Sequence, residues 1–304
     1  MGGIVVVGQV GRDLVLEVDG VPPEGGAAPV RRRRELLGGK GANQAVGCRQ
    51  LGAQAALVAV VGADAAGADA LAAAAADGID VTGVVRRDGA ATALLVDVVG
   101  PPGVRRLLED VPEEVLLRPD DVRAAAALLG GADAVLLQLQ QPGPAVAEAL
   151  GAVAPGTLVV ADGAPDDERV RELVLDRADA VRADTAETAA LTGRAPEDTA
   201  GTVRAARELL GRGPRVVALA SPEGADVVAW PGGHVVLPHL EPDPVDPTGG
   251  GDAFVAALAV GLLHGEEPGT AARWAAAASA QVAGTAGGRP GLSPELVRRQ
   301  APRG

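Results

Sequence analysis

The sequence predicts an α/β fold in which a central, mostly parallel sheet lies between layers of helices and a small β-sheet forms a lid. Short runs of Val, Leu, Ile and Ala, bounded by Gly, Pro or Asp, are typical of buried strands. They alternate with longer stretches of helical spacing, which predicts parallel strands covered on both faces. The chain of 304 residues contains no low-complexity linker, so we expect a single domain over residues 1–304.

Each element is predicted from its local composition. Buried strands are predicted at Ile4–Val7, Leu57–Val61, Leu94–Val99, Ala134–Leu139, Leu158–Ala161 and Val216–Leu219. Helices are predicted at Gly41–Leu51, Ala66–Ala76, Asp120–Leu129, Ala145–Val153, Thr199–Leu210, Asp252–His264 and Pro268 to about Val282. A hairpin at one edge of the sheet is predicted at Asp226–Trp230 and His234–Leu237. Short strand-like pieces at about 14–37 and 91–108 interrupt this alternation, and we expect them to form the lid.

The composition argues against several classes of partner. Apolar residues make up 47% of the chain, but with one Phe, two Trp and no Tyr it lacks stacking platforms for single-stranded nucleic acid. The formal net charge of −13 would repel a phosphate backbone or an anionic membrane. The basic run Arg31–Arg34 is interpreted as a solvated face, because Glu35 and the acidic remainder dilute it. We therefore expect neither nucleic acid nor a membrane as a partner.

Cysteine usage and the apolar runs predict a cytoplasmic protein. The single cysteine, Cys48, lies in an apolar stretch, which favours a buried thiol in a reducing compartment. The N-terminal segment has neither the basic region nor the long apolar region of a signal peptide. The longest apolar runs, such as Ala253–Leu263, are too short to span a bilayer.

The segment Val245–Phe254 (VDPTGGGDAF) is the strongest functional signal. Three consecutive glycines before a helix allow successive N–H groups to converge on an anion. Asp252 would stay ionised beside this positive potential and could accept a proton from an attacking hydroxyl. Asp246 is placed to hold a cation or to orient the loop. The structural alternative is a Gly-rich turn in which Asp252 only caps the helix.

A second segment, Gly38–Gln44 (GGKGANQ), offers exposed backbone and two polar side chains at the start of a helix. It is not a Walker A loop, because position 41 is Gly and position 34 is Arg. Lys40 and Asn43 suit hydrogen bonding to a polyol. A turn that only initiates the helix remains the alternative.

Together the two segments resemble the signatures of the ribokinase, or PfkB carbohydrate kinase, family. GGKGANQAVGCRQLGA followed by VGADAAG is similar to the family's N-terminal signature, and VDPTGGGDAF to its C-terminal one. They occur in the family's order, about two hundred residues apart, and the resemblance runs through nearly the whole chain. It implies a three-layer α/β/α ribokinase-like fold with a β-lid, and transfer of the γ-phosphoryl group of MgATP to a sugar hydroxyl. A homodimer formed through the lid is a further expectation.

The resemblance also implies roles for individual residues. Asp252 would be the catalytic base, with an anion hole formed by Gly249, Gly250 and Gly251. The positions implied for the acceptor are Asp13, Gly39, Lys40, Asn43, Gln140 and Asp252. Those implied for the nucleotide are Asp184, Glu187, Ser221 to Gly224 and Gly251, with Glu187 organising Mg²⁺ indirectly. A monovalent-cation site, for K⁺, is implied at Asp246, Thr248, Val282, Thr285, Gly287 and Gly291.

The chain departs from the ribokinase pattern most at the sugar end. Gly11 stands where ribokinases have a sugar-binding Asn, and Gln140 where they have Glu. Asp184 replaces an Asn, Ser221 replaces a glycine, and Gly291 replaces a polar residue. Three hypotheses stay open: a kinase for ribose or a related sugar, a kinase for a nucleoside or another sugar, and a non-catalytic sugar or nucleotide sensor. The lid segments have no aromatic residue to hold a base, and the intact Gly-Gly-Gly-Asp argues against a sensor.

Overall fold

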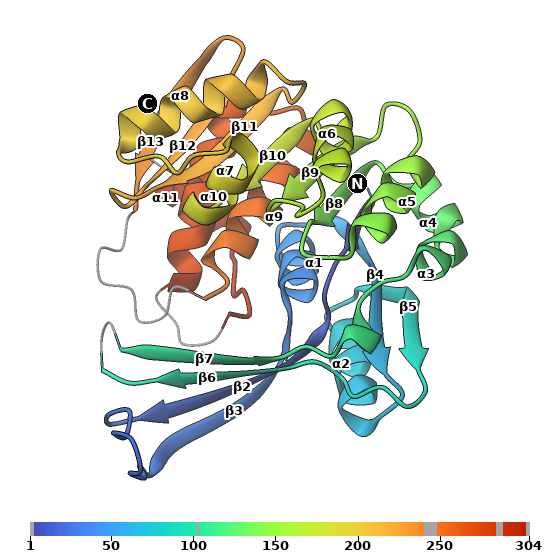
Figure 1. Ribbon diagram of the computed structural model, residues 1–304, viewed down its shortest axis with the longest axis vertical. Helices are drawn as coiled ribbons and strands as arrows, with labels where there is room; N and C mark the ends of the chain where they lie inside the picture. The colour runs from blue at the N-terminus through green and yellow to red at the C-terminus, as the bar shows by residue number, and fades with distance from the viewer. Residues whose placement is uncertain (1–2, 102–103, 240–247, 284–287, 302–304) are drawn as a thin grey trace.

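The computed structural model describes residues 3–101, 104–239, 248–283 and 288–301, and in these ranges nine strands form a large sheet (Figure 1). Their order across the sheet is β13-β12-β11-β10-β9-β8-β1-β4-β5. The strands are β1 (Gly3–Val7), β4 (Gln54–Gly62), β5 (Asp80–Arg87), β8 (Ala134–Gln138), β9 (Leu158–Asp162), β10 (Ala180–Ala183), β11 (Val216–Ser221), β12 (Ala225–Trp230) and β13 (Gly233–Pro238). Neighbouring strands are parallel, except that β12 is antiparallel to both β11 and β13.

This sheet confirms the predicted mostly parallel arrangement, and β12 and β13 form the expected edge hairpin. The predicted strand Leu94–Val99 belongs to the small sheet instead. We predicted no element at β5 or β10. Arg182 interrupts the short apolar run of β10, and β5 is a partly exposed edge strand with a glycine in its middle. Neither strand therefore shows the continuous apolar run on which the prediction depended.

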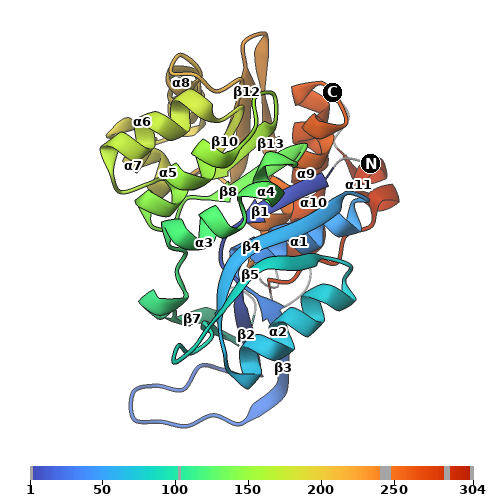
Figure 2. The same ribbon diagram turned by 90° about the vertical axis from the view of Figure 1, so that its right-hand side faces the viewer.

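Helices cover both faces of the large sheet, as Figure 2 shows. On one face lie α1 (Lys40–Gln50), α2 (Ala65–Ala76), α9 (Gly250–Leu263), α10 (Pro268–Ala283) and α11 (Pro294–Gln300). On the other lie α3 (Pro119–Ala124), α4 (Ala126–Gly130), α5 (Gly143–Ala152), α6 (Glu168–Arg177), α7 (Thr185–Thr192) and α8 (Thr199–Leu210), with a 3₁₀ turn at Glu113–Val115. The three-layer architecture is confirmed.

Small side chains let the helices of the first face approach one another closely. A Cβ atom at Gly47 of α1 would lie 2.8 Å from the Cβ of Ala256 in α9. One at Gly261 of α9 would lie 2.9 Å from the Cβ of Ala271 in α10. A chain almost without aromatic residues thus reaches a close-packed core through backbone proximity.

Local signals explain where several helices begin. The side chains of Asp64, Asp184 and Asp198 each accept a hydrogen bond from the backbone N–H three residues later, which caps α2, α7 and α8. The predicted helix Asp120–Leu129 is divided at Ala125, where the backbone (ψ 8°) leaves the helical range. Helices α6, α7 and α11 were not predicted.

The small sheet has four strands in the order β3-β2-β6-β7. They are β2 (Gly11–Val18), β3 (Val30–Gly38), β6 (Leu94–Val99) and β7 (Arg105–Asp110). This sheet projects from the body of the molecule at the lower left of Figure 1. Its strands lie within residues 11–38 and 94–110, close to the expected lid segments of about 14–37 and 91–108, and the predicted small lid sheet is confirmed.

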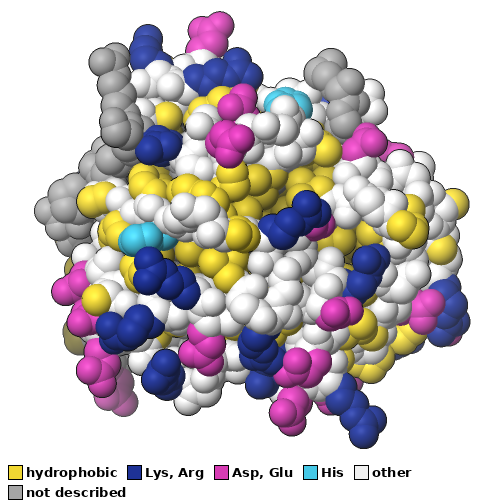
Figure 3. Space-filling view, turned by 90° about the horizontal axis from the view of Figure 1, so that it is seen from above, with side chains coloured by type: hydrophobic (Ala, Val, Ile, Leu, Met, Phe, Trp, Pro, Cys, Tyr) yellow, Lys and Arg dark blue, Asp and Glu magenta, His cyan; other side chains and the backbone are white. Residues whose placement is uncertain are grey.

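The basic run of the sequence lies on β3 and is balanced by acidic residues. Arg31 forms a salt bridge with Asp19, and Arg34 Nη2 lies 3.3 Å from Glu17 Oε1. On the face seen in Figure 3, basic and acidic side chains are interspersed. No helix within the described ranges is long and apolar enough to cross a membrane. Cys48 is buried as expected, and burial raises the pKa of its thiol to about 12.

Candidate active site

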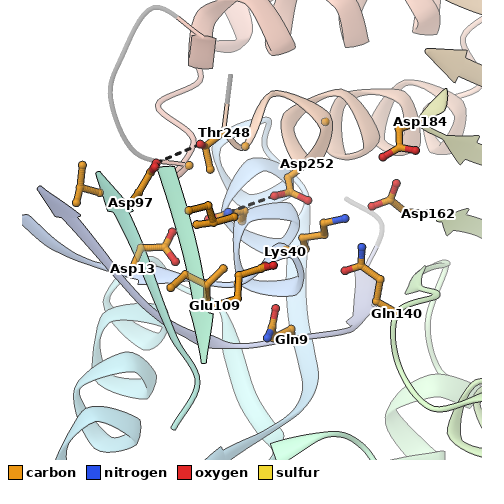
Figure 4. A pocket seen from close by; sticks show the side chains of 18 of the residues that line it. Gln9, Asp13, Lys40, Asp97, Glu109, Gln140, Asp162, Asp184, Thr248 and Asp252 are labelled. Carbon is orange, nitrogen blue, oxygen red and sulfur yellow. Dashed lines mark hydrogen bonds between the residues drawn. The ribbon is translucent and has the colours of Figure 1, made fainter. Parts of the chain in front are cut away.

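A cavity of about 480 Å³ lies between the lid sheet and the carboxyl ends of the parallel strands (Figure 4). Residues at or just after the ends of β1, β8, β9 and β10 line one side of it, and residues of β2, β6 and β7 line the other. The N-termini of α1 and α9 also reach this cavity. Because ligands of open α/β sheets bind outside the carboxyl ends of the strands, we take it as the candidate active site.

The predicted glycine segment forms the N-terminus of α9. Gly249 has a left-handed backbone (φ 75°), and a Cβ atom there would lie 1.9 Å from the carbonyl oxygen of Gly288. No residue with a side chain therefore fits. Gly250 and Gly251 follow as the first helical residues, where backbone N–H groups have no partner inside the helix. These donors and the helix dipole suit this end of the cavity to an anion.

Asp252 lies in the first turn of α9, and Gly249 caps the helix, so the alternative in which Asp252 is the cap is wrong. The Asp252 side chain is buried and accepts hydrogen bonds from Asn43 Nδ2 and Gln44 Nε2, both at 3.2 Å. Burial, followed by the charge of Asp162, raises the pKa of Asp252 to about 7. We expected the helix N-terminus to keep this carboxyl ionised, but desolvation outweighs that effect. A pKa near the operating pH is well suited to a general base.

Three residues that were not predicted for the site lie beside Asp252, namely Gln44, Asp162 and Arg182. Gln44 Nε2 donates to Asp162 Oδ2 at 2.8 Å as well as to Asp252, and so links the two carboxyl groups. Arg182 is the register partner of Asp162 on the neighbouring strand, and its Nη1 lies 3.3 Å from Asp162 Oδ1. A charge within a strand that is covered on both faces was the sequence signal that could have revealed both residues.

The residues expected to bind the acceptor lie together in the cavity: Asp13, Gly39, Lys40, Asn43 and Gln140. The Asp13 carboxyl group, on β2, is buried against Gly38 of β3, where a Cβ atom would lie 1.9 Å from Asp13 Oδ1. Lys40 and Asn43 stand three residues apart on α1, and therefore on the same side of the helix. In Figure 4 Asp13 lies on the side of the lid strands, and the Lys40 side chain extends toward Gln140 and Asp162.

Two glutamines before it in the chain orient the Gln140 amide. The Gln9 backbone N–H donates to Gln138 Oε1 at 2.7 Å, and Gln138 Nε2 donates to Gln140 Oε1 at 2.9 Å. Because a backbone N–H can only donate, it fixes the Gln138 amide, and Gln138 in turn fixes Gln140. Gln140 Nε2 is thereby left as a donor for the cavity, where a carboxylate could only accept.

Asp184 and Glu187 form a capping box at the start of α7. Asp184 Oδ1 accepts from the Glu187 N–H and Glu187 Oε2 from the Asp184 N–H, each at 2.8 Å. Burial raises the pKa of Glu187, while Lys40 and Arg182, each 3.9 Å from one of its oxygens, oppose the rise. Asp184 lines the cavity, whereas Glu187 is not among the residues that line it.

Ser221 and Gly224, which were expected to bind the nucleotide, are not among the residues that line the cavity. They belong to the tight turn between β11 and β12, in which the Gly224 N–H donates to the Ser221 carbonyl at 3.2 Å. Ser221 Oγ lies 2.9 Å from Thr199 Oγ1, at the start of α8. The structure therefore does not bring this turn together with Asp252.

The expected cation site is only partly described. Asp246, Thr285 and Gly287 lie outside the described residues. Thr248 lines the cavity, and its hydroxyl donates to Asp97 Oδ2 of the lid at 3.2 Å. Val282 is buried near the end of α10. Within the described ranges, no cluster of three or more His, Cys, Asp or Glu side chains could hold a metal ion.

Solved structures share this fold along the whole chain. The structure of Arabidopsis thaliana ribokinase complexed with ribose and ATP matches with a TM-score of 0.78 and 24% identity, covering 100% of this chain and 99% of that one. Phosphofructokinase-2 from Escherichia coli in complex with potassium matches with a TM-score of 0.79 and 16% identity, covering 98% of each chain. The fold is therefore of the ribokinase-like α/β class.

Sequence comparisons identify the family. The pfkB family carbohydrate kinase pattern matches residues 1–295. Mouse ribokinase is 31% identical over 298 residues, which cover 93% of this chain and 90% of that protein. The ATP-dependent ribose-1-phosphate kinase of Halopiger xanaduensis is 32% identical over 304 residues, with 97% and 96% covered. The chain also spans 48% of the length of a bifunctional ribokinase/ribose-5-phosphate isomerase A from Fructilactobacillus sanfranciscensis, at 29% identity over 261 residues.

The protein belongs to the pfkB family of carbohydrate kinases, and is thus a phosphotransferase with an alcohol group as acceptor.

Proposed function

We propose that the protein transfers the γ-phosphoryl group of ATP to a hydroxyl of ribose or a related sugar, with Asp252 as the proton acceptor. The observation that carries this proposal is the position of Asp252. It is buried in the first turn of α9, directly after the glycine anion site, and it lines a cavity that Asp13, Lys40 and Asn43 also line. As the acceptor oxygen bonds to the γ-phosphorus, the bond from that phosphorus to the oxygen of the leaving ADP breaks, and the hydroxyl proton passes to Asp252.

The nucleotide would lie with its phosphates between the N-terminus of α9 and the start of α7. Gly249 and Gly251 line that end of the cavity, and Lys40 and Arg182 supply positive charge there. Glu187 would organise Mg²⁺ indirectly, through water, and Asp184 would lie near the phosphates; each carboxylate already accepts one backbone hydrogen bond at 2.8 Å. When bound, Mg²⁺ neutralises part of the phosphate charge. We also place the base-binding end of the nucleotide near the turn that holds Ser221 and Gly224.

A phosphorylated sugar is a second candidate acceptor. The relative named ribose-1-phosphate kinase supports it, as does the Gln140 amide, which offers a donor instead of a repelling carboxylate. The test is a screen of purified protein with MgATP against ribose, other pentoses and hexoses, ribose-1-phosphate and nucleosides, with ADP release as the readout. Turnover with ribose supports the first proposal, and turnover restricted to ribose-1-phosphate supports the second. Binding without turnover for every compound would instead indicate a sensor.

Further expectations concern the domain, its location, its assembly and a monovalent cation. The whole chain would form one kinase domain in the cytoplasm, with residues of about 14–37 and 91–108 as its lid. A homodimer would form through that lid, whose outer strand β7 exposes Leu108 at 59%. Sedimentation of Leu108→Asp would test the dimer.

A K⁺ ion beside the anion site would shape the loop around Thr248. Activity should then rise when K⁺ replaces a bulky organic cation at constant ionic strength, and equal rates in the two salts would contradict the K⁺ site.

A further inference from the structure

Arg182 is one of the residues of the large sheet that line the cavity. Asp162 on β9 lies in register with Gln138 on β8 and with Arg182 on β10. Their three side chains therefore leave the sheet on the same face. That face is the one covered by α1 and α9, whose N-termini reach the cavity. The Arg182 side chain is 17% exposed, and what is exposed contributes to the cavity lining.

Two carboxyl groups hold one edge of the Arg182 guanidinium. Nη1 lies 3.3 Å from Asp162 Oδ1 and 3.9 Å from Glu187 Oε2. Asp162 is itself fixed by Gln44 Nε2 at 2.8 Å, and Glu187 by the Asp184 N–H at 2.8 Å. The guanidinium is therefore oriented before any ligand binds.

The other edge of the guanidinium faces the anion site. Nη2 lies 2.9 Å from the point that a Cβ atom at Gly251 would occupy, so it takes the space that the missing side chain leaves free. Among the described residues, none accepts a hydrogen bond from Nη2. Its two N–H donors thus stand beside the first turn of α9 within the cavity lining.

We propose that Arg182 is a further catalytic residue, which donates from Nη2 to the phosphoryl group during transfer. This inference rests on the proposed placement of that group at Gly249–Gly251. During transfer, the negative charge of the phosphoryl group is spread over its three non-bridging oxygens. The N-terminus of α9 supplies hydrogen-bond donors to them from one side. A guanidinium held at a fixed position supplies further donors without reorganisation when the reaction occurs.

A purely structural role for Arg182 is the competing interpretation. In that role it would only neutralise Asp162 and Glu187, and its loss would affect folding stability and the protonation of Asp252. The turnover number at high pH, where Asp252 is ionised in every variant, would then be unchanged. Kinetics on the pH plateau therefore separate the two roles.

The experiment compares Arg182→Gln, Arg182→Lys and Arg182→Ala with the wild type, using MgATP and the best acceptor from the screen. Arg87→Gln is a matched control, because Arg87 is 13% exposed and paired with Asp121 at 2.6 Å, away from the cavity lining. We expect Arg182→Gln to lower the plateau kcat by at least about a hundredfold, with acceptor KM changed by less than about threefold. Arg182→Lys should keep an intermediate rate, since lysine keeps the positive charge but lacks the planar pair of N–H donors of the guanidinium. Arg87→Gln should lower Tm and leave kcat unchanged.

Chemical rescue provides a readout that a structural role would not move. Added guanidinium chloride at low millimolar concentration should partly restore the kcat of Arg182→Ala relative to equal NaCl, and should not stimulate Arg87→Gln. A plateau kcat within about threefold of wild type for Arg182→Gln would overturn the inference. Asp252→Asn in the same assay separates a wrong role for Arg182 from a wrong active site. If Asp252→Asn is inactive while Arg182→Gln is active, only the role of Arg182 is wrong. If both variants keep wild-type rates, the proposed site itself is wrong.

Discussion

The Thr248 hydroxyl donates to Asp97 Oδ2 at 3.2 Å and thereby joins the loop before the anion site to the buried face of lid strand β6 (Figure 4). Asp97 Oδ1 accepts from Arg105 Nε on the neighbouring strand at 2.7 Å, so the carboxylate is held from both sides. This contact couples the position of the lid to the loop that presents Gly249.

Thr248→Val removes this hydroxyl while keeping the shape of the side chain. We expect kcat/KM for the acceptor to fall by about tenfold, because a hydrogen bond to a charged group contributes roughly 1.5 kcal/mol or more. The control is Thr192→Val, whose hydroxyl donates to carbonyls near the end of α7. Steady-state kinetics of both variants measure the effect, and equal kcat/KM values would show that the lid contact does not influence catalysis.

Asp252→Asn should lower kcat by about 10²–10⁴-fold, since the variant cannot accept the hydroxyl proton. Nucleotide binding should survive, because the change acts on the transition state more than on bound ATP. Calorimetry with a non-hydrolysable ATP analogue checks the binding, and ADP release checks the rate. Asp133→Asn serves as the control, because that carboxyl accepts the Gly3 N–H at 2.7 Å at the opposite end of the sheet. Retention of more than about a tenth of wild-type kcat would show that Asp252 is not the base.

The rate should depend on the ionisation of Asp252. Burial, with the help of Asp162, raises its pKa to about 7, so activity should be full above that pH and should fall about tenfold per unit below it. Removing the charge of Asp162 lowers the pKa of Asp252, and Asp162→Asn should therefore move the acid limb of the kcat profile to lower pH. Lys40 acts in the opposite direction, and Lys40→Met should move the limb to higher pH. Profiles that coincide for the three proteins would contradict this assignment.

Asp13→Ala should raise acceptor KM by one to two orders of magnitude, corresponding to about 1.5–3 kcal/mol for hydrogen bonds to a charged group. A carboxylate can accept from two vicinal hydroxyls, and Asp13 is buried at the lid side of the cavity. The KM for ATP should change little, because Asp184 and Glu187 lie on a different element, α7. If Asp13 only stabilises the turn after β1, Tm will fall while acceptor KM stays the same.

Residues that are close in sequence were predicted best. The anion site depends on consecutive glycines and on the helix that follows them, and both are local properties of Gly249–Asp252. The same holds for Lys40 and Asn43 on α1. Arg182 and Asp162 were missed because each is a single charge in a short apolar strand. Their pairing across β9 and β10 shows what that charge does.

The sequence by itself determined the α/β class, the small lid sheet and the glycine-rich start of α9, because periodicity, turn residues and glycine geometry act over a few neighbouring positions. The tertiary structure alone decided how Asp252 is protonated and what surrounds it. Desolvation requires the packed helices around it, and the charge of Asp162 reaches it from a strand that lies ninety positions earlier in the chain. Such long-range electrostatic effects depend on distances that only the folded chain sets.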